Sequence, residues 1–302
     1  MAVVKPGYLV DASVFIFRAY YSMPADMADR DGRPVNALYG FARFLGDLLE
    51  EARPTLIGVA FDESLTHSYR NQIYPAYKAQ REPAPAELAE QFSRCRELCV
   101  HLGLAACGSD HYEADDIIGT WSTRLRSEGC SSVLVTRDKD LSQLIRPGDY
   151  FWDFSAARRY AYGDIAERFG VVPERMADYL ALTGDAVDNI PGVPGVGPKT
   201  AAVLLHHYES LDHLYDNLDG VPALPLRGAA RVRDQLHTHR EAAYLARELT
   251  RIACDVPLPA HATTLARAKP DLAALESFYD AAGFGAALKR QAARLHEQLP
   301  AG

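Results

Sequence analysis

Three short apolar runs in the first half of this chain each lead into aspartate. The runs are residues 8–10, 56–61 and 133–135, and the acids that follow them are Asp11, Asp62, Asp138 and Asp140. Dozens of residues with helical character separate one run from the next, which is typical of parallel strands joined by helices. Because ligand sites form where such strands end, three distant segments deliver acids to one edge of the sheet. The pattern predicts an α/β fold with a mainly parallel, twisted sheet flanked by helices.

Apolar residues that recur at spacings of three and four predict helices between these strands. They cover residues 37–52, 85–101 and 114–127. After about residue 165 the strand signals fade, and short helical stretches separated by glycine and proline follow. These stretches are residues 173–182, 200–207 and 241–252, with a loop expected at 221–226. We therefore expect one domain over residues 1–165 and a smaller, mainly helical region over residues 166–302.

The composition is that of a globular protein able to bury a sizeable core, since 48% of the 302 residues are hydrophobic. No basic leader precedes an apolar run, and no stretch approaches the roughly eighteen apolar residues that a membrane span needs. Five cysteines form no C-x-x-C pair, and Cys95 and Cys99 are interpreted as buried thiols. These features predict a cytoplasmic protein that does not bind membranes.

Two further segments add carboxylates. They contribute Glu113, Asp115 and Asp116 at the start of a predicted helix, and Asp185 and Asp188 in a later turn. Helix capping, which favours acids by roughly 0.3–1 kcal/mol each, explains one or two of the first group. Gathering so many carboxylates is costly unless cations lie between them, and oxygen ligands without histidine or cysteine select Mg²⁺ or Mn²⁺. Two such ions can hydrolyse a phosphodiester, so the pattern predicts metal-assisted phosphoryl transfer to water.

The formal charge of −8 does not exclude a nucleic-acid partner. Phosphate contacts need lysine and arginine, which a strongly acidic protein lacks. Removing the nine negative charges assigned to the metal site leaves a balance of +1. Bound divalent ions cancel more of the deficit locally.

A basic and aromatic segment follows Asp62. Its residues Arg70, Tyr74, Tyr77, Lys78 and Arg81 fall at offsets 0, 4, 7, 8 and 11, which is one face of a helix that Pro75 would kink or interrupt. That face combines cations for phosphate with rings for base stacking, above the carboxyl edge of the sheet. The alternative is a surface helix whose tyrosines pack inward and whose cations are solvated.

A glycine-rich hairpin over residues 190–202 runs into a helix. Its candidate DNA-binding residues are Gly192, Gly195, Gly197, Lys199 and Thr200. Glycines allow close backbone approach, and amides at a helix N-terminus can hold a phosphate, as in a helix-hairpin-helix DNA clamp. A nucleotide-binding P-loop is disfavoured because Pro198 separates glycine from lysine. A purely structural turn stays open.

These motifs together resemble one known family. They are Leu-Val-Asp-Ala-Ser, Phe-Arg-Ala-Tyr, Tyr-Gly-Phe, Val-Ala-Phe-Asp, Tyr-Lys-Ala-Gln-Arg, Glu-Ala-Asp-Asp, Asp-Lys-Asp, Thr-Gly-Asp-Ala-Val-Asp-Asn and Pro-Gly-Val-Pro-Gly-Val-Gly. In this order, over residues 8–290, they resemble the 5′ nuclease (flap endonuclease) superfamily, most closely the 5′–3′ exonuclease domain of bacterial DNA polymerase I. Arg137 and Pro198 depart from the usual pattern, where a small and an acidic residue are common.

The resemblance implies roles for individual residues. The nine acids already named match the metal site, Lys78 matches the basic residue near the attacked phosphate, and Arg70 and Arg81 match cations of a helical arch over residues 66–86. Arg18 and Tyr20 match residues along the DNA path. The hairpin, within residues 180–210, would grip duplex DNA and hold a monovalent ion such as K⁺.

The implied function is structure-specific 5′–3′ exonuclease and 5′ flap endonuclease action in DNA replication and repair, by a two-metal mechanism with Mg²⁺, or Mn²⁺ in its place. Expected partners are DNA with 5′ ends, flaps or junctions and a polymerase or ligase, bound by a monomer. The chain ends at Gly302, which leaves no room for a polymerase domain, so we expect a free-standing nuclease or the nuclease part of a longer protein. The alternatives are a non-catalytic DNA-junction binding protein and a PIN-type metal-dependent ribonuclease.

Overall fold

The computed structural model describes residues 6–63, 67–82 and 84–299. A six-stranded sheet in the order β3-β2-β1-β4-β5-β6 forms its centre. The strands are β1 (Gly7–Asp11), β2 (Leu56–Asp62), β3 (Ala105–Ser109), β4 (Ser132–Val135), β5 (Tyr150–Asp153) and β6 (Arg158–Ala161). All neighbours pair in parallel except β5 and β6. The predicted α/β class and its three apolar strands are confirmed, whereas β3, β5 and β6 were not predicted.

Alternate residues of the central strands supply two different cores, because successive side chains of a strand point to opposite faces. Tyr8 and Val10 pack with α1 (Ala12–Ser22), α2 (Asn36–Ala52) and α4 (Ala86–His101) on one face. Leu9 packs on the other face with α5 (Ala114–Ser127) and α6 (Tyr162–Phe169). Burial on both faces explains why these strands are continuous apolar runs.

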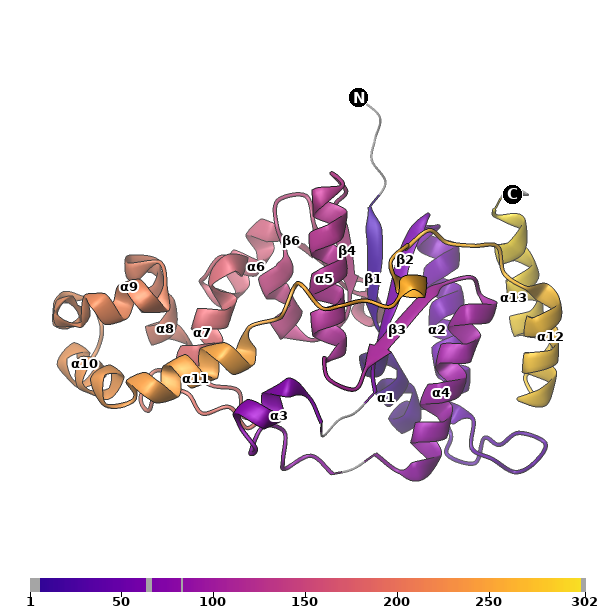
Figure 1. Cartoon of the computed structure of the whole chain (residues 1–302), viewed down its shortest axis with the longest axis horizontal. Helices are drawn as coiled ribbons and strands as arrows, with labels where there is room; N and C mark the ends of the chain where they lie inside the picture. The colour runs from indigo at the N-terminus through magenta and orange to yellow at the C-terminus, as the bar shows by residue number, and fades with distance from the viewer. Residues whose placement is uncertain (1–5, 64–66, 83, 300–302) are drawn as a thin grey trace.

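A helical unit extends from one end of the sheet and has a core of its own (Figure 1). It contains α7 (Met176–Thr183), α8 (Pro198–Tyr208), α9 (Leu211–Asp216), α10 (Ala229–Thr238) and α11 (Arg240–Thr250). Short 3₁₀ helices are η1 (Lys139–Leu144), η2 (Phe154–Ala156), η3 (Pro173–Arg175), η4 (Leu218–Ala223) and η5 (Ala260–Ala262). Helix η4 covers the first half of the stretch predicted as a loop.

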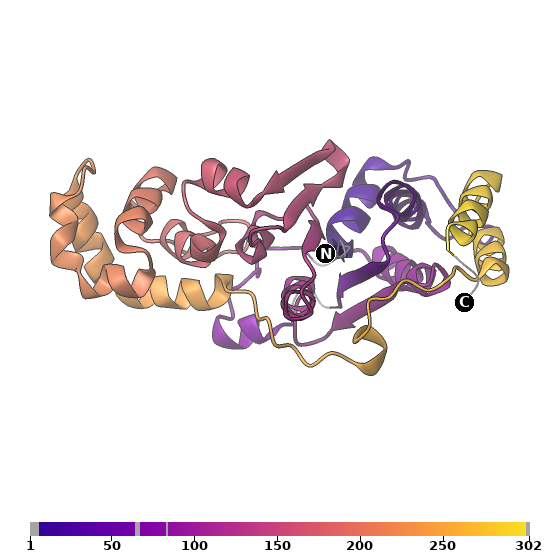
Figure 2. The same ribbon diagram turned by 90° about the horizontal axis from the view of Figure 1, so that it is seen from above.

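The last two helices return to the sheet. Helices α12 (Leu272–Ala281) and α13 (Ala286–Glu297) pack against α4 and α2, at the end of the molecule opposite the helical unit (Figure 2). The core of the helical unit therefore runs only from Val171 to Leu249, apart from Tyr77. Along the described part of the chain, no helix has the length and apolar character required to cross a membrane.

The predicted helix over residues 70–81 is wrong. Helix α3 (Tyr69–Ile73) is five residues long and ends at Tyr74, whose backbone is extended. The proline at position 75 disfavours helical geometry in the residue before it and removes a helical donor. Residues 74–81 form turns, with Lys78 in the left-handed region at φ 54°. The expected basic and aromatic helix face does not form.

Gly58 in β2 lies against the buried indole ring of Trp121, which donates a hydrogen bond from Nε1 to the carbonyl oxygen of Ala262 at 2.8 Å. A Cβ atom at Gly58 would lie 2.8 Å from the ring atom Cζ3. We expect Gly58→Ala to lower the free energy of unfolding by about 1–3 kcal/mol, because the ring must shift in a packed core. Urea denaturation measures this, with Gly163→Ala, where a Cβ meets no neighbour, as the control. Equal urea midpoints for Gly58→Ala and Gly163→Ala would contradict a close contact between Gly58 and Trp121.

Candidate active site

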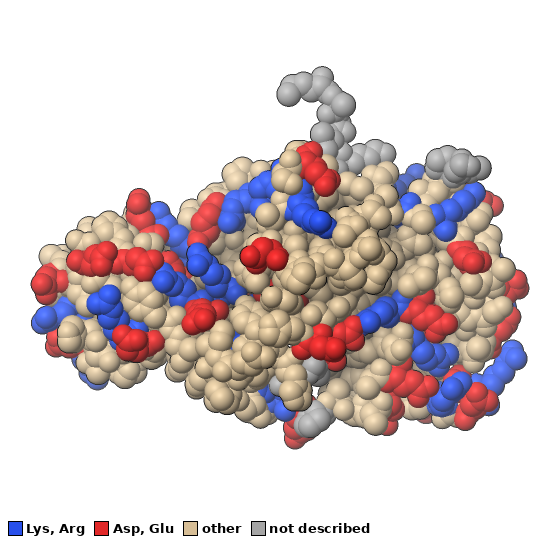
Figure 3. Space-filling view, in the orientation of Figure 1, with Lys and Arg blue, Asp and Glu red and all other residues tan. Residues whose placement is uncertain are grey.

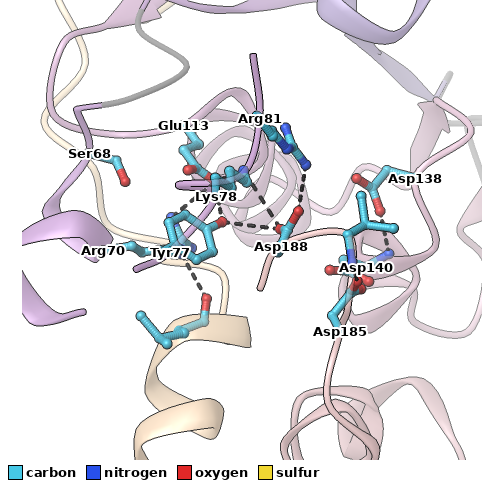
Figure 4. Close-up of polar contacts among 12 residues, drawn as sticks. Ser68, Arg70, Tyr77, Lys78, Arg81, Glu113, Asp138, Asp140, Asp185 and Asp188 are labelled. Atoms are coloured by element: carbon cyan, nitrogen blue, oxygen red, sulfur yellow. Dashed lines mark hydrogen bonds and ion pairs between the residues drawn. The ribbon is translucent and has the colours of Figure 1, made fainter. Parts of the chain in front are cut away.

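The acids gather at the carboxyl edge of the sheet, as the sequence predicted. Asp11 and Asp62 end β1 and β2, and Asp138 and Asp140 lie where β4 leads into η1. Glu113 caps α5, with Asp115 in the first turn of that helix. Asp185 and Asp188 come from the hairpin after α7. Figure 4 shows acids from three of these segments facing a common space beside Lys78 and Arg81. On the face drawn in Figure 3, acidic and basic side chains are interspersed.

Four inner acids, Asp11, Asp62, Asp115 and Asp138, interact with one another, and none of them forms an ion pair within the described residues. Asp11 is 3% exposed, and its carboxylate accepts a hydrogen bond from Oγ1 of Thr136 at 2.9 Å. Burial, followed by the charges of Asp62 and Asp138, raises the pKa of Asp11 to about 8. Burial and then the charges of Asp138, Asp11 and Asp62 raise the pKa of Asp115. These acids therefore repel one another across a shared space.

The outer acids are instead paired with cations of the chain. Nζ of Lys78 lies 2.9 Å from Oε2 of Glu113 and 3.7 Å from Oδ2 of Asp188, whose other oxygen binds Arg81. Burial opposes ionisation of Glu113, but Lys78 and Arg70 outweigh it and lower the pKa of that carboxyl. Lys78, predicted near the attacked phosphate, and Arg81, predicted as a cation of the helical arch, thus both lie at the acid cluster.

Lys139, which the sequence analysis passed over, holds a second pair of acids. Its ammonium group binds Asp185 and lies 3.1 Å from Oδ1 of Asp140. Burial, followed by the charge of Asp138, raises the pKa of Asp140 to about 7. In the described part of the chain, Oδ1 of Asp140 accepts no hydrogen bond although it is buried. The position of Lys139 between two acids of the Asp-Lys-Asp motif was the available signal.

Hydrogen bonds to backbone carbonyl oxygens of the hairpin hold the basic segment, residues 74–81, against it. The N–H of Lys78 donates to the carbonyl oxygen of Asp188 at 3.0 Å. Nε2 of Gln80 donates to the carbonyl oxygens of Ala186 and Val187 at 3.2 and 2.9 Å. Neither contact was evident from spacing. Together they set the position of Lys78 above the acids.

Arg70 is not an exposed cation. It is 2% exposed, and its guanidinium donates to both oxygens of Asp116 at 2.7 and 2.8 Å and to the carbonyl oxygens of Leu249 and Arg251. Asp116 is fully buried, and its carboxylate accepts four hydrogen bonds, two of them from backbone N–H groups. The prediction that Arg70 shares an exposed face with Lys78 and Arg81 is wrong. The pair ties α3, α5 and the end of α11 together.

The predicted stacking ring of Tyr77 is also buried. It is 3% exposed within the core of the helical unit, and its hydroxyl donates to Oε2 of Glu113 at 3.1 Å. Tyr20 is half-buried, with its hydroxyl 2.9 Å from Oε1 of Glu87. Arg18 is exposed on α1, and its side chain has no ion pair or hydrogen bond within the described residues. Of these three, Arg18 is the side chain free to meet a ligand.

The glycines of the hairpin differ in what they approach. A Cβ at Gly192 would lie 2.5 Å from the backbone nitrogen of Gly184, so this glycine permits close packing within the chain itself. Gly195, with φ 82°, and Gly197 face open space. Lys199 is exposed in the first turn of α8. The two-helix hairpin exists as expected, and its DNA-binding role stays a prediction.

The donor set fits a hard divalent cation by its chemistry. In residues 6–63, 67–82 and 84–299, no three acidic, histidine or cysteine side chains form a group that could hold a metal ion as placed. Burial and the charges of neighbouring carboxylates raise the pKa values of Asp11, Asp115 and Asp140, so these acids repel one another. All donors are oxygens, which suits Mg²⁺ or Mn²⁺.

Comparison with known families decides the relationship. Residues 6–170 match the 5′-3′ exonuclease N-terminal resolvase-like domain, and residues 171–273 match the 5′-3′ exonuclease C-terminal SAM fold. The chain belongs to the 5′–3′ exonuclease family. The resemblance inferred from the motifs is confirmed.

Relatives of this 5′–3′ exonuclease family member include two much longer polymerases. DNA polymerase I of Rhizobium leguminosarum is 40% identical over 258 residues, which are 83% of this chain and 25% of the polymerase. The thermostable DNA polymerase I of Thermus filiformis is 36% identical over 284 residues, 94% of this chain and 33% of the polymerase. The chain thus spans a quarter to a third of their length.

Two solved structures share the fold of this exonuclease family member. T5 5′-exonuclease with bound zinc ions has a TM-score of 0.65 and 21% identity, covering 97% of this chain and 99% of that one. The catalytic core of Rad2 in complex with a DNA substrate has a TM-score of 0.63 and 16% identity, covering 97% and 92%. At these identities the likeness supports the architecture.

Replacing Arg70 tests whether its ion pair with Asp116 stabilises the fold. Arg70→Met leaves the Asp116 carboxylate buried without its cation, so we expect the free energy of unfolding to fall by about 3–5 kcal/mol in a urea titration. Arg81→Met is the control and should cost less than about 1 kcal/mol, because its ion pair is partly exposed. Adding Asp116→Leu to Arg70→Met should restore part of the loss. Equal stability of Arg70→Met and Arg81→Met would contradict this assignment.

Proposed function

We propose that this protein is a divalent-metal-dependent 5′–3′ exonuclease and 5′ flap endonuclease that hydrolyses DNA phosphodiester bonds in replication and repair. The observation that carries the proposal is the group of four inner acids without ion pairs among the described residues, beside the cations Lys78 and Arg81. Membership of the 5′–3′ exonuclease family supports the reaction and its polarity. The DNA complexes of structurally similar nucleases support the substrate class.

The acids at the carboxyl edge of the sheet divide into two candidate sets of metal ligands. Asp11, Asp62, Asp115 and Asp138 would hold one divalent cation, and Asp140, Asp185 and Asp188 would contribute to a second, with Glu113 between the sets. Bound Mg²⁺ or Mn²⁺ supplies an activated water and neutralises charge on the scissile phosphate. T5 5′-exonuclease with bound divalent ions is a structural precedent for such a site. Asp116 would orient the first turn of α5 through its four hydrogen bonds.

Lys78 and Arg81 would stabilise charge on the phosphate during cleavage. Burial opposes the charge on Lys78, but Glu113 and Asp188 outweigh it and raise its pKa, which favours the ammonium form. The Arg81 side chain is 35% exposed, which leaves its guanidinium able to turn toward a strand. Cations aimed at developing negative charge are among the largest contributions to phosphoryl transfer.

The hairpin would hold the duplex away from the point of cleavage. Gly195 and Gly197 present open backbone, and Lys199 and Thr200 lie in the first turn of α8, where amides can bind a phosphate. A monovalent ion such as K⁺ fits the proposed role of such a hairpin. Binding to DNA by a single copy, in a pathway with a polymerase or ligase, completes the proposal.

Cleavage of a 5′-labelled flap duplex in Mg²⁺ tests the function. We expect cutting near the flap junction, abolished by EDTA and lowered at least about 100-fold in Asp115→Asn, because one ligand of the inner set loses its charge. Asp110→Asn, an exposed acid outside the cluster, is the matched control and should cut normally. Tight flap binding without cutting in Mg²⁺ or Mn²⁺ would favour a junction-binding protein. Cleavage restricted to RNA would favour a ribonuclease.

Metal binding should also stabilise the fold independently of catalysis. A cation that relieves repulsion among the inner acids binds the folded state, so at 100 times its dissociation constant Mn²⁺ should add about 2.7 kcal/mol to the free energy of unfolding. Thermal unfolding with and without Mn²⁺ measures this, and Asp115→Asn should reduce the gain while Asp110→Asn keeps it. An unchanged melting temperature in wild type across a Mn²⁺ titration would contradict a metal site at this edge.

A further inference from the structure

A cavity of about 350 Å³ lies between α1, α2 and the turn after β5. The residues that line it include Phe15, Arg18, Arg43, Phe44 and Phe154. Helix α1 starts immediately after Asp11, and Arg18 is seven residues further on, about 10 Å along the helix axis. The cavity is therefore one or two nucleotides' length from the inner acids. Apart from Arg18, none of these residues was assigned to the site described above.

Aromatic rings form one side of the cavity. Phe15 and Phe44 stack with ring centroids 3.8 Å apart and planes 9° apart, and Phe154 meets Phe44 edge to face at 5.5 Å. Phe15 is buried, whereas Phe44 and Phe154 are half-buried and keep aromatic surface toward the cavity. A flat ring system of a ligand can pack on that surface, as bases do on aromatic side chains.

Two unpaired cations form another side. Arg18 and Arg43 are exposed, and within the described residues neither side chain has an ion pair or hydrogen bond. The lining also contains one acid, Asp47, which accepts a hydrogen bond from the neutral amide Nε2 of Gln291 at 3.1 Å, so the lining carries two cationic side chains and one acidic one. Guanidinium groups bind phosphate oxygens with two parallel hydrogen bonds. Aromatic surface beside two free guanidinium groups is complementary to a base joined to a phosphate.

We propose that this cavity binds a single nucleotide, with its base against Phe44 and Phe154 and its phosphate between Arg18 and Arg43. A volume of 350 Å³ is at the lower end of the range for small-ligand pockets, which favours one nucleotide over a longer segment. The nucleotide is an unpaired residue of the bound DNA or a free 5′-monophosphate, which share this chemistry. The DNA source rests on the proposed nuclease function.

Close packing fixes the spacing of the two helices that carry the arginines. A Cβ at Gly40 of α2 would lie 2.5 Å from Cβ of Ala19 in α1 and 3.2 Å from Cγ of Met23, so the glycine lets the two helices approach closely at the cavity wall. Arg18 and Arg43 project from these two helices. Their separation is therefore set by the α1–α2 contact, and a ligand need not order a loop to bring them together.

Binding of deoxyadenosine 5′-monophosphate, measured by calorimetry in EDTA, tests the cavity without any cleavage. We expect saturable binding that weakens about 10-fold or more in Phe44→Leu and in Arg43→Gln, while Arg124→Gln, an exposed arginine on α5, binds as wild type does. Deoxyadenosine without phosphate should bind more weakly than the nucleotide. Phe44→Leu keeps an apolar side chain, and circular dichroism checks that each variant is folded.

A flap duplex with 2-aminopurine at the unpaired position next to the junction distinguishes the two sources, again in EDTA. Fluorescence quenching in wild type that is lost in Phe44→Leu and Arg43→Gln would identify the DNA strand as the source, and monophosphate binding alone would identify a free nucleotide. Either result supports the cavity. Absence of both, or equal binding by wild type and both variants, would overturn it. Nucleotide binding by a protein that cuts no DNA would reject the nuclease function and leave the cavity standing.

Discussion

Negative charge buried at the carboxyl edge of the sheet must be balanced, and the way the chain balances it determines how its parts are held together. Arg70 neutralises Asp116, Lys78 neutralises Glu113, and Lys139 neutralises Asp185. Each pair joins segments that are distant in the sequence, so charge compensation and tertiary assembly are the same set of contacts. Within the described residues, the inner acids Asp11, Asp62, Asp115 and Asp138 form no ion pair, which is why their chemistry points to an external cation.

The helical unit is positioned by polar contacts more than by a shared core. Gln143 at the end of η1 donates to the carbonyl oxygen of Thr250 and accepts from the N–H of Ile252. Asn189 in the hairpin donates to the carbonyl oxygen of Ala76 at 2.7 Å. Such hydrogen bonds are directional, so they constrain how η1 lies against the end of α11 and how the basic segment lies against the hairpin. That constraint matters where acids from both parts meet.

Sequence reasoning succeeded where the signal was local and failed where it was not. The central strands were predictable because burial on both faces demands apolar runs, whereas β3, with its Ala-Ala-Cys-Gly-Ser sequence, carries no such run. The acids were predictable because strand ends share an edge. The burial of Arg70 was not, because its carbonyl partner Leu249 lies 179 residues away, and helical spacing records nothing about a neighbour from so distant a segment. Pro75 ends the helix that the spacing of the residues around it predicts, because proline disfavours helical geometry in the residue before it.

Tyr77 belongs to the core of the helical unit, while its neighbour Lys78 lies against an acid of the sheet domain. The Tyr77 hydroxyl and Nζ of Lys78 both contact Oε2 of Glu113, and the N–H of Lys78 donates to the carbonyl oxygen of Asp188 in the hairpin. Two adjacent residues thus join three separately folded parts of the chain, namely the helical core, the first turn of α5 and the hairpin. A substitution that disturbs this one junction therefore affects all three parts at once.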